Sequence, residues 1–129
     1  MSEKFKILFI GDIVGRCGRQ VVEHYLVKLN NKSKYDFIIA NVENASHGFG
    51  LTSKNHDELL SYGISAMTSG NHIWDKKEIL NYIDSSSAII RPYNYHKSTA
   101  GVGYRIFEKI IVINLLGKTF MPPIDCPFV

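Results

Sequence analysis

Short apolar runs rich in β-branched side chains recur along the chain and predict buried β-strands. They span residues 5–10, 36–42, 64–68 and 88–91. Gly11 stops the first run and Pro92 follows the last, and both residues disfavour continuation of a strand.

Between these runs the apolar residues follow a helical spacing. Residues 19–31 place their large apolar side chains on one helical face. That face comprises Val21, Val22, Tyr25, Leu26 and Leu29. A second helix is predicted over 53–62, with Thr52 or Ser53 as its N-cap and Gly63 just beyond its end.

The rest of the chain predicts one more helix and then a hairpin. Asp75 is expected to cap a helix running to about Ile83, because Glu78 three residues later completes a capping-box pattern. Residues 103–108 and 110–115 favour an antiparallel hairpin. Because helices separate the earlier strands, those strands must be parallel, with right-handed connections. The predicted fold class is α/β, a mainly parallel sheet with flanking helices and a C-terminal β-hairpin.

The composition is that of an ordinary folded domain. The 129 residues are 45% hydrophobic and 21% charged, with 15 Lys and Arg against 12 Asp and Glu, a net charge of +3. These values exclude intrinsic disorder and give no argument for nucleic-acid binding. The sequence lacks an apolar stretch of about 20 residues for a membrane span, and it lacks a signal-peptide pattern. Cys17 and Cys126 form no CxxC pair. We expect one cytoplasmic domain over residues 1–129, without a membrane partner.

Polar residues with metal-ligand chemistry follow each of the first three predicted strands. Gly11-Asp12 follows the first, Glu43-Asn44 the second and Gly70-Asn71-His72 the third. The carboxyl ends of parallel strands lie on one edge of a sheet, so these side chains are expected to converge. Carboxylate, amide oxygen and imidazole suit Mn, Fe, Mg or Zn ions, and a bridging carboxylate suits a two-metal centre.

Each of these residues taken alone has a structural alternative. Asp and Asn are common in the turns after strands, and an isolated His is more often a hydrogen-bonded structural residue. Three such strand ends in succession favour a functional site. His47 follows Asn44 in a glycine-flanked loop, where it either lines that site or is simply exposed.

Arg16 and Arg19 follow the first strand, near the start of the predicted helix. Guanidinium groups and free backbone N–H groups at that position suit a substrate phosphate, and a solvated turn is the equal alternative. The segment is neither a Walker loop nor a GxGxxG motif, because it lacks GK[ST] and the required glycine spacing. Ile13 stands where a serine hydrolase with a GDS motif needs its nucleophile, which excludes that class.

These residues resemble the calcineurin-like metallophosphoesterases, which carry GD after the first strand and GNH after the third. Five strings in order resemble the bacterial 2′,3′-cyclic-nucleotide 2′-phosphodiesterase-like branch of that family. They are GDIVGRCGR, NVENASHGFGLT, GNHIWDKKEI, RPYNY and FMPPIDCPF. The resemblance covers essentially the whole chain and implies half of an αββα sandwich.

The resemblance implies a centre of two divalent metal ions, usually iron or manganese. Asp12 would ligate the first ion, and Glu43 would bridge the pair. Asn44 and Asn71 would complete the ligands from this part of the chain. His72 would act as general acid or stabilise charge on the leaving oxygen. The implied reaction is in-line attack of a metal-bound hydroxide on a phosphodiester such as a 2′,3′-cyclic nucleotide.

The chain departs from that branch in length, since members run to about twice as many residues. Their second half adds histidines in HAE-type and GTHTH-type motifs, which this sequence lacks, so we expect it to be an N-terminal half. One hypothesis is a phosphodiesterase completed by a complementary C-terminal half chain or by another subunit of a homo-oligomer. The alternative is an inactive fragment or a metal- or nucleotide-binding module. An exposed sheet edge predicts self-association of the chain alone.

Overall fold

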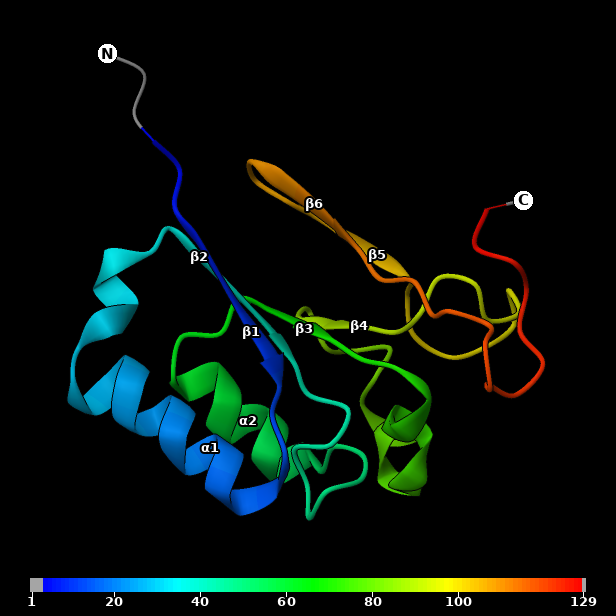
Figure 1. Cartoon of the computed structure of the whole chain (residues 1–129), viewed down its shortest axis with the longest axis horizontal. Helices are drawn as coiled ribbons and strands as arrows, with labels where there is room; N and C mark the ends of the chain where they lie inside the picture. Colours follow the sequence, from blue (N-terminus) through cyan, green and yellow to red (C-terminus); the bar gives the residue numbers. More distant parts are fainter. Residues whose placement is uncertain (1–3, 129) are drawn as a thin grey trace.

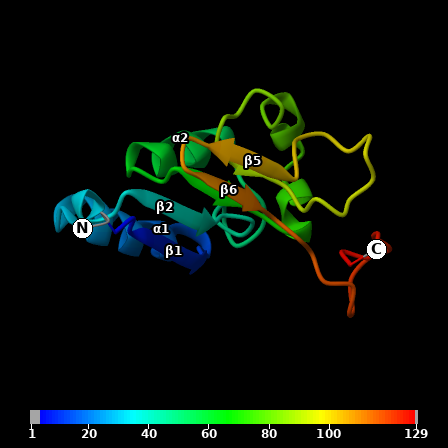
Figure 2. The same ribbon diagram turned by 90° about the horizontal axis from the view of Figure 1, so that it is seen from above.

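The computed structural model describes residues 4–128. A parallel sheet contains, in spatial order, β1 (Ile7–Asp12), β2 (Phe37–Asn41), β3 (Ala66–Thr68) and β4 (Ile89–Ile90). The helices α1 (Gly15–Glu23) and α2 (Ser53–Ser61) lie on one side of it (Figure 1). An antiparallel hairpin of β5 (Tyr104–Phe107) and β6 (Ile110–Ile113) lies on the other side (Figures 1 and 2). The predicted α/β class, the parallel sheet and the hairpin are confirmed.

Two apolar clusters hold these layers together, one on each face of the sheet. The cluster beneath the helices includes Leu26, Ile38, Ala40, Val42 and Leu59. The cluster beneath the hairpin consists of Phe37, Ile39, Ala66, Ile90 and Val112. Successive residues of β2 therefore face opposite clusters, which explains why this strand is apolar throughout.

The helix α2 begins and ends where the sequence predicts. The hydroxyl oxygen of Thr52 accepts a hydrogen bond from the backbone N–H of Asn55 at 3.3 Å, so Thr52 is the N-cap. Gly63 follows the helix with a φ of +95°, in the left-handed region that glycine adopts readily. None of the helices in residues 4–128 is long and apolar enough to cross a membrane.

The helix α1 starts earlier than predicted and buries less of its apolar face. It begins at Gly15 and continues into a π-helical turn over His24–Lys28. The buried stripe is the pair Val22 and Leu26, whereas Val21 is 69% exposed and Leu29 is 55% exposed. The stripe is narrower than the predicted face, and a π-helical turn changes the spacing on which that prediction depended.

The helix predicted to begin at Asp75 is wrong. Two short 3₁₀ segments, η3 (Asn71–Asp75) and η4 (Lys77–Asn81), occupy this region, and neither has a side-chain N-cap bond. Lys76 between them has an extended backbone, with φ −104° and ψ 103°. A Cβ built on Gly50 would lie 2.9 Å from the backbone nitrogen of Lys76, so the two backbones pack closely. This contact holds Lys76 outside helical geometry.

β1 is an edge strand and is not buried on both faces as predicted. Ile7 is 47% exposed and Phe9 is 61% exposed. They are in register with Phe37 and Ile39, which face the hairpin, so they point to the same side. The hairpin does not extend over β1 (Figure 2), which leaves these side chains uncovered. The outer face of the hairpin also exposes Tyr104, Ile106, Ile111 and Ile113.

Candidate metal centre

A β-bulge sets the position of Asp12, the last residue of β1. The register with β2 shifts between Ile10 and Asp12, so that Ile10 pairs with Ala40 and Asp12 with Asn41. The additional residue in β1 is Gly11. Bulges commonly redirect a side chain beside a functional site. Here the bulge precedes an exposed carboxylate at the carboxyl edge of the sheet.

Hydrogen bonds join Asp12, Asn44 and His72 into one unit. The Nδ2 atom of Asn44 donates to Oδ1 and Oδ2 of Asp12 at 3.1 and 2.9 Å. The Oδ1 atom of Asn44 lies 2.6 Å from Nδ1 of His72. Because an amide oxygen only accepts hydrogen bonds, we assign the ring proton to Nδ1 of His72. The Nε2 atom is then the nitrogen that can exchange a proton with another group.

Glu43 is attached to the same unit through the backbone. Its Oε2 atom accepts a hydrogen bond from the backbone N–H of His72 at 3.1 Å. Its Oε1 atom accepts a longer one from Nδ2 of Asn41 at 3.4 Å. A Cβ built on Gly70 would overlap both carboxylate oxygens. The missing side chain of Gly70 therefore gives the carboxylate of Glu43 its space.

Asn71 is half-buried at the start of η3, between Gly70 and His72 in the chain. In the described residues its side chain makes no hydrogen bond to the side chains of Asp12, Glu43 or Asn44. Its place at this edge of the sheet follows from the strand β3 that precedes it.

The two arginines after β1 differ in their surroundings. Arg16 is an exposed residue in the first turn of α1. The Nε atom of Arg19 lies 3.0 Å from Oε2 of Glu58, and its Nη1 atom donates to the carbonyl of Ala45 at 2.5 Å. Arg19 therefore ties the loop after β2 to α2. Only Arg16 of this pair has a guanidinium that is open to a phosphate.

His47 is exposed and has a φ of +60°. It lines a pocket of about 490 Å³ together with Arg19, Lys54 and Glu58, none of which belongs to the Asp12–His72 unit. The structure therefore places His47 in different surroundings from the residues that were predicted as ligands.

His56, Asp57 and Ser86 are arranged like a catalytic triad, but their role is structural. The ring nitrogens of His56 lie 2.9 Å from Oδ1 of Asp57 and 2.9 Å from Oγ of Ser86. The Ser86 hydroxyl also accepts the backbone N–H groups of Ala88 and Ile89, both at 3.2 Å. His56 and Ser86 are each 7% exposed, so a substrate cannot reach them. They fix the entry into β4.

Two aromatic residues beside the unit were missing from the sequence prediction. The ring of Phe49 meets that of His72 edge to face, with centroids 5.4 Å apart. The pKa of Tyr95 is raised, chiefly by burial and further by the charge of Glu43, while a hydrogen bond with Trp74 lowers it. Tyr95 follows β4, just as the predicted ligands follow the first three strands. Its position after a strand could therefore have predicted it from the sequence.

The donor atoms fit part of a divalent-metal centre. Carboxylate oxygens of Asp12 and Glu43 and amide oxygens of Asn44 and Asn71 are hard ligands that such ions accept. The space left by Gly70 keeps one of these carboxylates unobstructed. The set is incomplete, because within residues 4–128 no three His, Cys, Asp or Glu side chains are grouped closely enough to hold an ion.

Comparison with known proteins identifies the family. The family model described as YmdB-like protein matches residues 8–129. The chain belongs to the YmdB-like family. It is 48% identical over 127 residues to the 2′,3′-cyclic-nucleotide 2′-phosphodiesterase of Bacillus subtilis, which confirms the predicted resemblance. The alignment covers 95% of this chain and 48% of the relative, so the chain spans about half the length of that protein.

Two solved structures share the fold of this chain. A hypothetical protein from Thermus thermophilus matches with a TM-score of 0.90 and 34% identity, over 96% of this chain and 50% of that one. A novel phosphatase from Mycoplasma pneumoniae matches with a TM-score of 0.88 and 33% identity, over 99% and 49%. The sheet and hairpin described above therefore correspond to about half of each structure.

Proposed function

We propose that this YmdB-like chain supplies one half of the active site of a metal-dependent phosphodiesterase that acts on 2′,3′-cyclic nucleotides. The observation that carries this proposal is the hydrogen-bonded unit of Asp12, Asn44 and His72, with Glu43 attached, at the carboxyl edge of the sheet. Ligands of open parallel sheets bind at that edge. The identity to the Bacillus subtilis phosphodiesterase supports the substrate class.

Two divalent ions, iron or manganese, are the proposed cofactors. Asp12 would ligate one ion, Glu43 would bridge the two, and Asn44 and Asn71 would add amide oxygens. When bound, such ions lower the pKa of a water molecule and neutralise the negative charge that develops at phosphorus. The hydrogen bonds from Asn44 hold both oxygens of Asp12 next to the amide of Asn44.

His72 is the proposed general acid. The short contact between its Nδ1 atom and Oδ1 of Asn44 fixes the ring and its tautomer. In its protonated form the ring can then donate from Nε2 to the leaving oxygen, or stabilise the charge on that oxygen. Arg16 in the first turn of α1 would bind a phosphate oxygen, because guanidinium groups and helix N-termini both attract anions.

The test is hydrolysis of 2′,3′-cyclic AMP with added Mn²⁺. We expect the purified chain to turn over slowly or not at all, and turnover to rise when the second half of the Bacillus subtilis relative is added. Asn71→Ala should then lower the rate by about 100-fold, as loss of an electrostatic or metal contact does. A folded complex that hydrolyses nothing would instead support an inactive metal- or nucleotide-binding module, which the incomplete ligand set favours.

The uncovered apolar faces give a complementary half a place to dock. Ile7 and Phe9 of β1 are exposed on the hairpin side of the sheet. Within residues 4–128, β6 pairs only with β5. A further strand beside β6 would both continue the hairpin into a larger sheet and cover β1. Because relatives are about twice as long, we propose that the occupant is the polypeptide that corresponds to their second half.

Phe9→Lys is expected to weaken that complex by at least about tenfold, since it places a charge in an apolar contact. The matched control is Val21→Lys on α1, on the other side of the sheet, where the wild-type side chain is 69% exposed. Sedimentation of the chain with and without the second half measures both variants. The chain alone should self-associate. A homo-oligomer that excludes the second half, or equal binding by both variants, would overturn the proposed occupant.

A further inference from the structure

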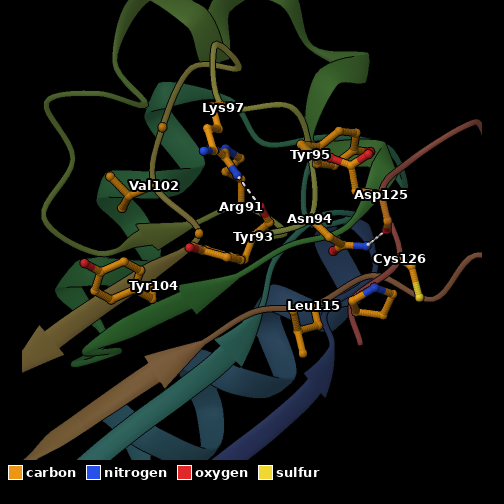
Figure 3. A pocket seen from close by; sticks show the side chains of 13 residues that line it. Arg91, Tyr93, Asn94, Tyr95, Lys97, Val102, Tyr104, Leu115, Asp125 and Cys126 are labelled. Atoms are coloured by element: carbon orange, nitrogen blue, oxygen red, sulfur yellow. Dashed lines mark hydrogen bonds between the residues drawn. The ribbon is translucent and has the colours of Figure 1, made fainter. Parts of the chain in front are cut away.

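Two strings singled out in the sequence lie outside the proposed metal centre, and they meet in space. RPYNY covers residues 91–95 after β4, and FMPPIDCPF covers 120–128. The Nδ2 atom of Asn94 donates to the carbonyl of Asp125 at 2.9 Å, and the N–H of Asp125 donates to the carbonyl of Asn94 at 3.1 Å. Residues of both strings line a pocket of about 480 Å³ (Figure 3).

Buried side chains hold the wall of this pocket in place. Arg91 is 6% exposed, and its guanidinium donates to four backbone carbonyls. These carbonyls belong to Pro92, Tyr93, Thr99 and Ala100. Asn94 also exchanges hydrogen bonds with the backbone of Leu116, at 2.8 and 2.9 Å. A wall fixed in this way binds a ligand without first having to become ordered.

The mouth of the pocket is aromatic, with a cation close by. Tyr93 and Tyr104 are 57% and 48% exposed, and their ring centroids lie 6.1 Å apart at an angle of 59°. Val102 and Leu115 extend the apolar surface, and Lys97 adds an ammonium group to the lining (Figure 3). Aromatic faces beside a positive charge suit a flat heteroaromatic ring that carries an anionic group.

The pocket lies at the edge of the sheet that holds the proposed metal centre. RPYNY comes directly after β4. In the same way, Asp12 is the last residue of β1 and His72 comes shortly after β3. Tyr95 lines the pocket and meets Trp74 of η3 edge to face, with ring centroids 5.8 Å apart. Trp74 is two residues from His72. The pocket wall and the segment that carries His72 are therefore in direct contact.

We propose that this pocket binds the nucleobase of the substrate, which contacts the rings of Tyr93 and Tyr104. This inference rests on the proposed function, because it names the part of a nucleotide that the metal centre does not hold. Lys97 would attract the phosphate or the electron-rich edge of the base. The size of the pocket is within the range of small-molecule sites, which measure about 300–1,000 Å³.

Binding of adenosine, which carries the base without a phosphate, tests the pocket separately from catalysis. We expect the metal-free chain to bind adenosine saturably in an NMR titration, and Tyr93→Ala to weaken binding by about tenfold. Tyr93→Phe keeps the ring and should bind as the wild type does. The matched control is Tyr25→Ala, which removes an exposed tyrosine of the π-helical turn after α1. Failure to bind adenosine, or equal weakening by the two alanine variants, would overturn the proposal.

The outcomes for the pocket and for the proposed function can be distinguished. Ribose 2′,3′-cyclic phosphate lacks the base, so its hydrolysis by the complex with the second half depends on the metal centre and tests the proposed function without the pocket. Hydrolysis of this compound without adenosine binding would overturn the proposed nucleobase pocket and leave the proposed phosphodiesterase activity supported. Adenosine binding without hydrolysis of either cyclic phosphate would overturn the proposed phosphodiesterase activity but support the proposed nucleobase pocket.

Discussion

Asp12→Asn is expected to reduce phosphodiester hydrolysis by about 100-fold or more, in whichever form of the protein shows turnover. The substitution removes a negative charge and also disturbs the unit around it. Both oxygens of Asp12 accept hydrogen bonds from Nδ2 of Asn44. An amide at position 12 offers one oxygen and one NH₂ group, so Asn44 must lose a bond or rotate. Rotation would turn its Oδ1 atom away from His72, which it contacts at 2.6 Å.

Calorimetric titration with Mn²⁺ and the rate of 2′,3′-cyclic AMP hydrolysis measure the two effects of Asp12→Asn separately. The matched control is Asp36→Asn, because Asp36 precedes β2 and lies at the amino edge of the sheet. Its carboxylate accepts the backbone N–H of Lys6 at 2.7 Å, and an amide oxygen can do the same. Wild-type Mn²⁺ affinity and turnover in Asp12→Asn would exclude Asp12 from the centre.

The sheet and the hairpin could be predicted because their signals are local. An apolar run between polar loops indicates a strand, and the spacing between runs determines which connections are possible. The same local signal does not distinguish an edge strand from a central one. β1 and β2 have similar sequences, yet Phe9 is 61% exposed while Ile39 is 8% exposed. That difference depends on where the hairpin lies, about 100 residues later in the chain.

The helix predicted from Asp75 to about Ile83 is wrong because of a contact with a distant part of the chain. Asp75 and Glu78 match a capping box, and their local preference alone favours a helix. The backbone of Gly50, from another part of the chain, packs against Lys76 and holds it in an extended conformation. A tertiary contact therefore overrides a correct local signal.

The residue types of the candidate site could be predicted, but their contacts could not. Strand ends place Asp12, Asn44 and His72 on one edge of the sheet, and the structure joins them by hydrogen bonds. Nothing in the sequence indicates that Glu58 engages Arg19, because the two are far apart along the chain. Tyr95 could have been predicted in the same way from its place after the fourth strand.

Gly70→Ala and Gly103→Ala should distinguish residues that the metal centre needs from residues that the stability of the fold needs. At position 70 the new Cβ would overlap the carboxylate of Glu43, which is the free end of a flexible side chain and can move. We expect near-wild-type stability but a loss of about 10- to 100-fold in metal affinity and turnover. At position 103 the Cβ would overlap the Cα of Tyr93, which belongs to the backbone and cannot move alone. We expect a loss of about 1–3 kcal/mol in the free energy of unfolding.

Urea unfolding measures the stability of each alanine variant, and titration measures its affinity for Mn²⁺. We expect each variant to change a different one of these two quantities. The Gly70 variant should change only metal binding, since Glu43 loses the position in which its Oε2 atom accepts the N–H of His72 at 3.1 Å. The Gly103 variant should unfold at lower urea and, once folded, bind Mn²⁺ normally, because Gly103 packs against Tyr93 in the proposed nucleobase pocket. Unchanged Mn²⁺ affinity in Gly70→Ala would mean that the carboxylate of Glu43 is not a ligand, and the bridging role proposed for it would fail.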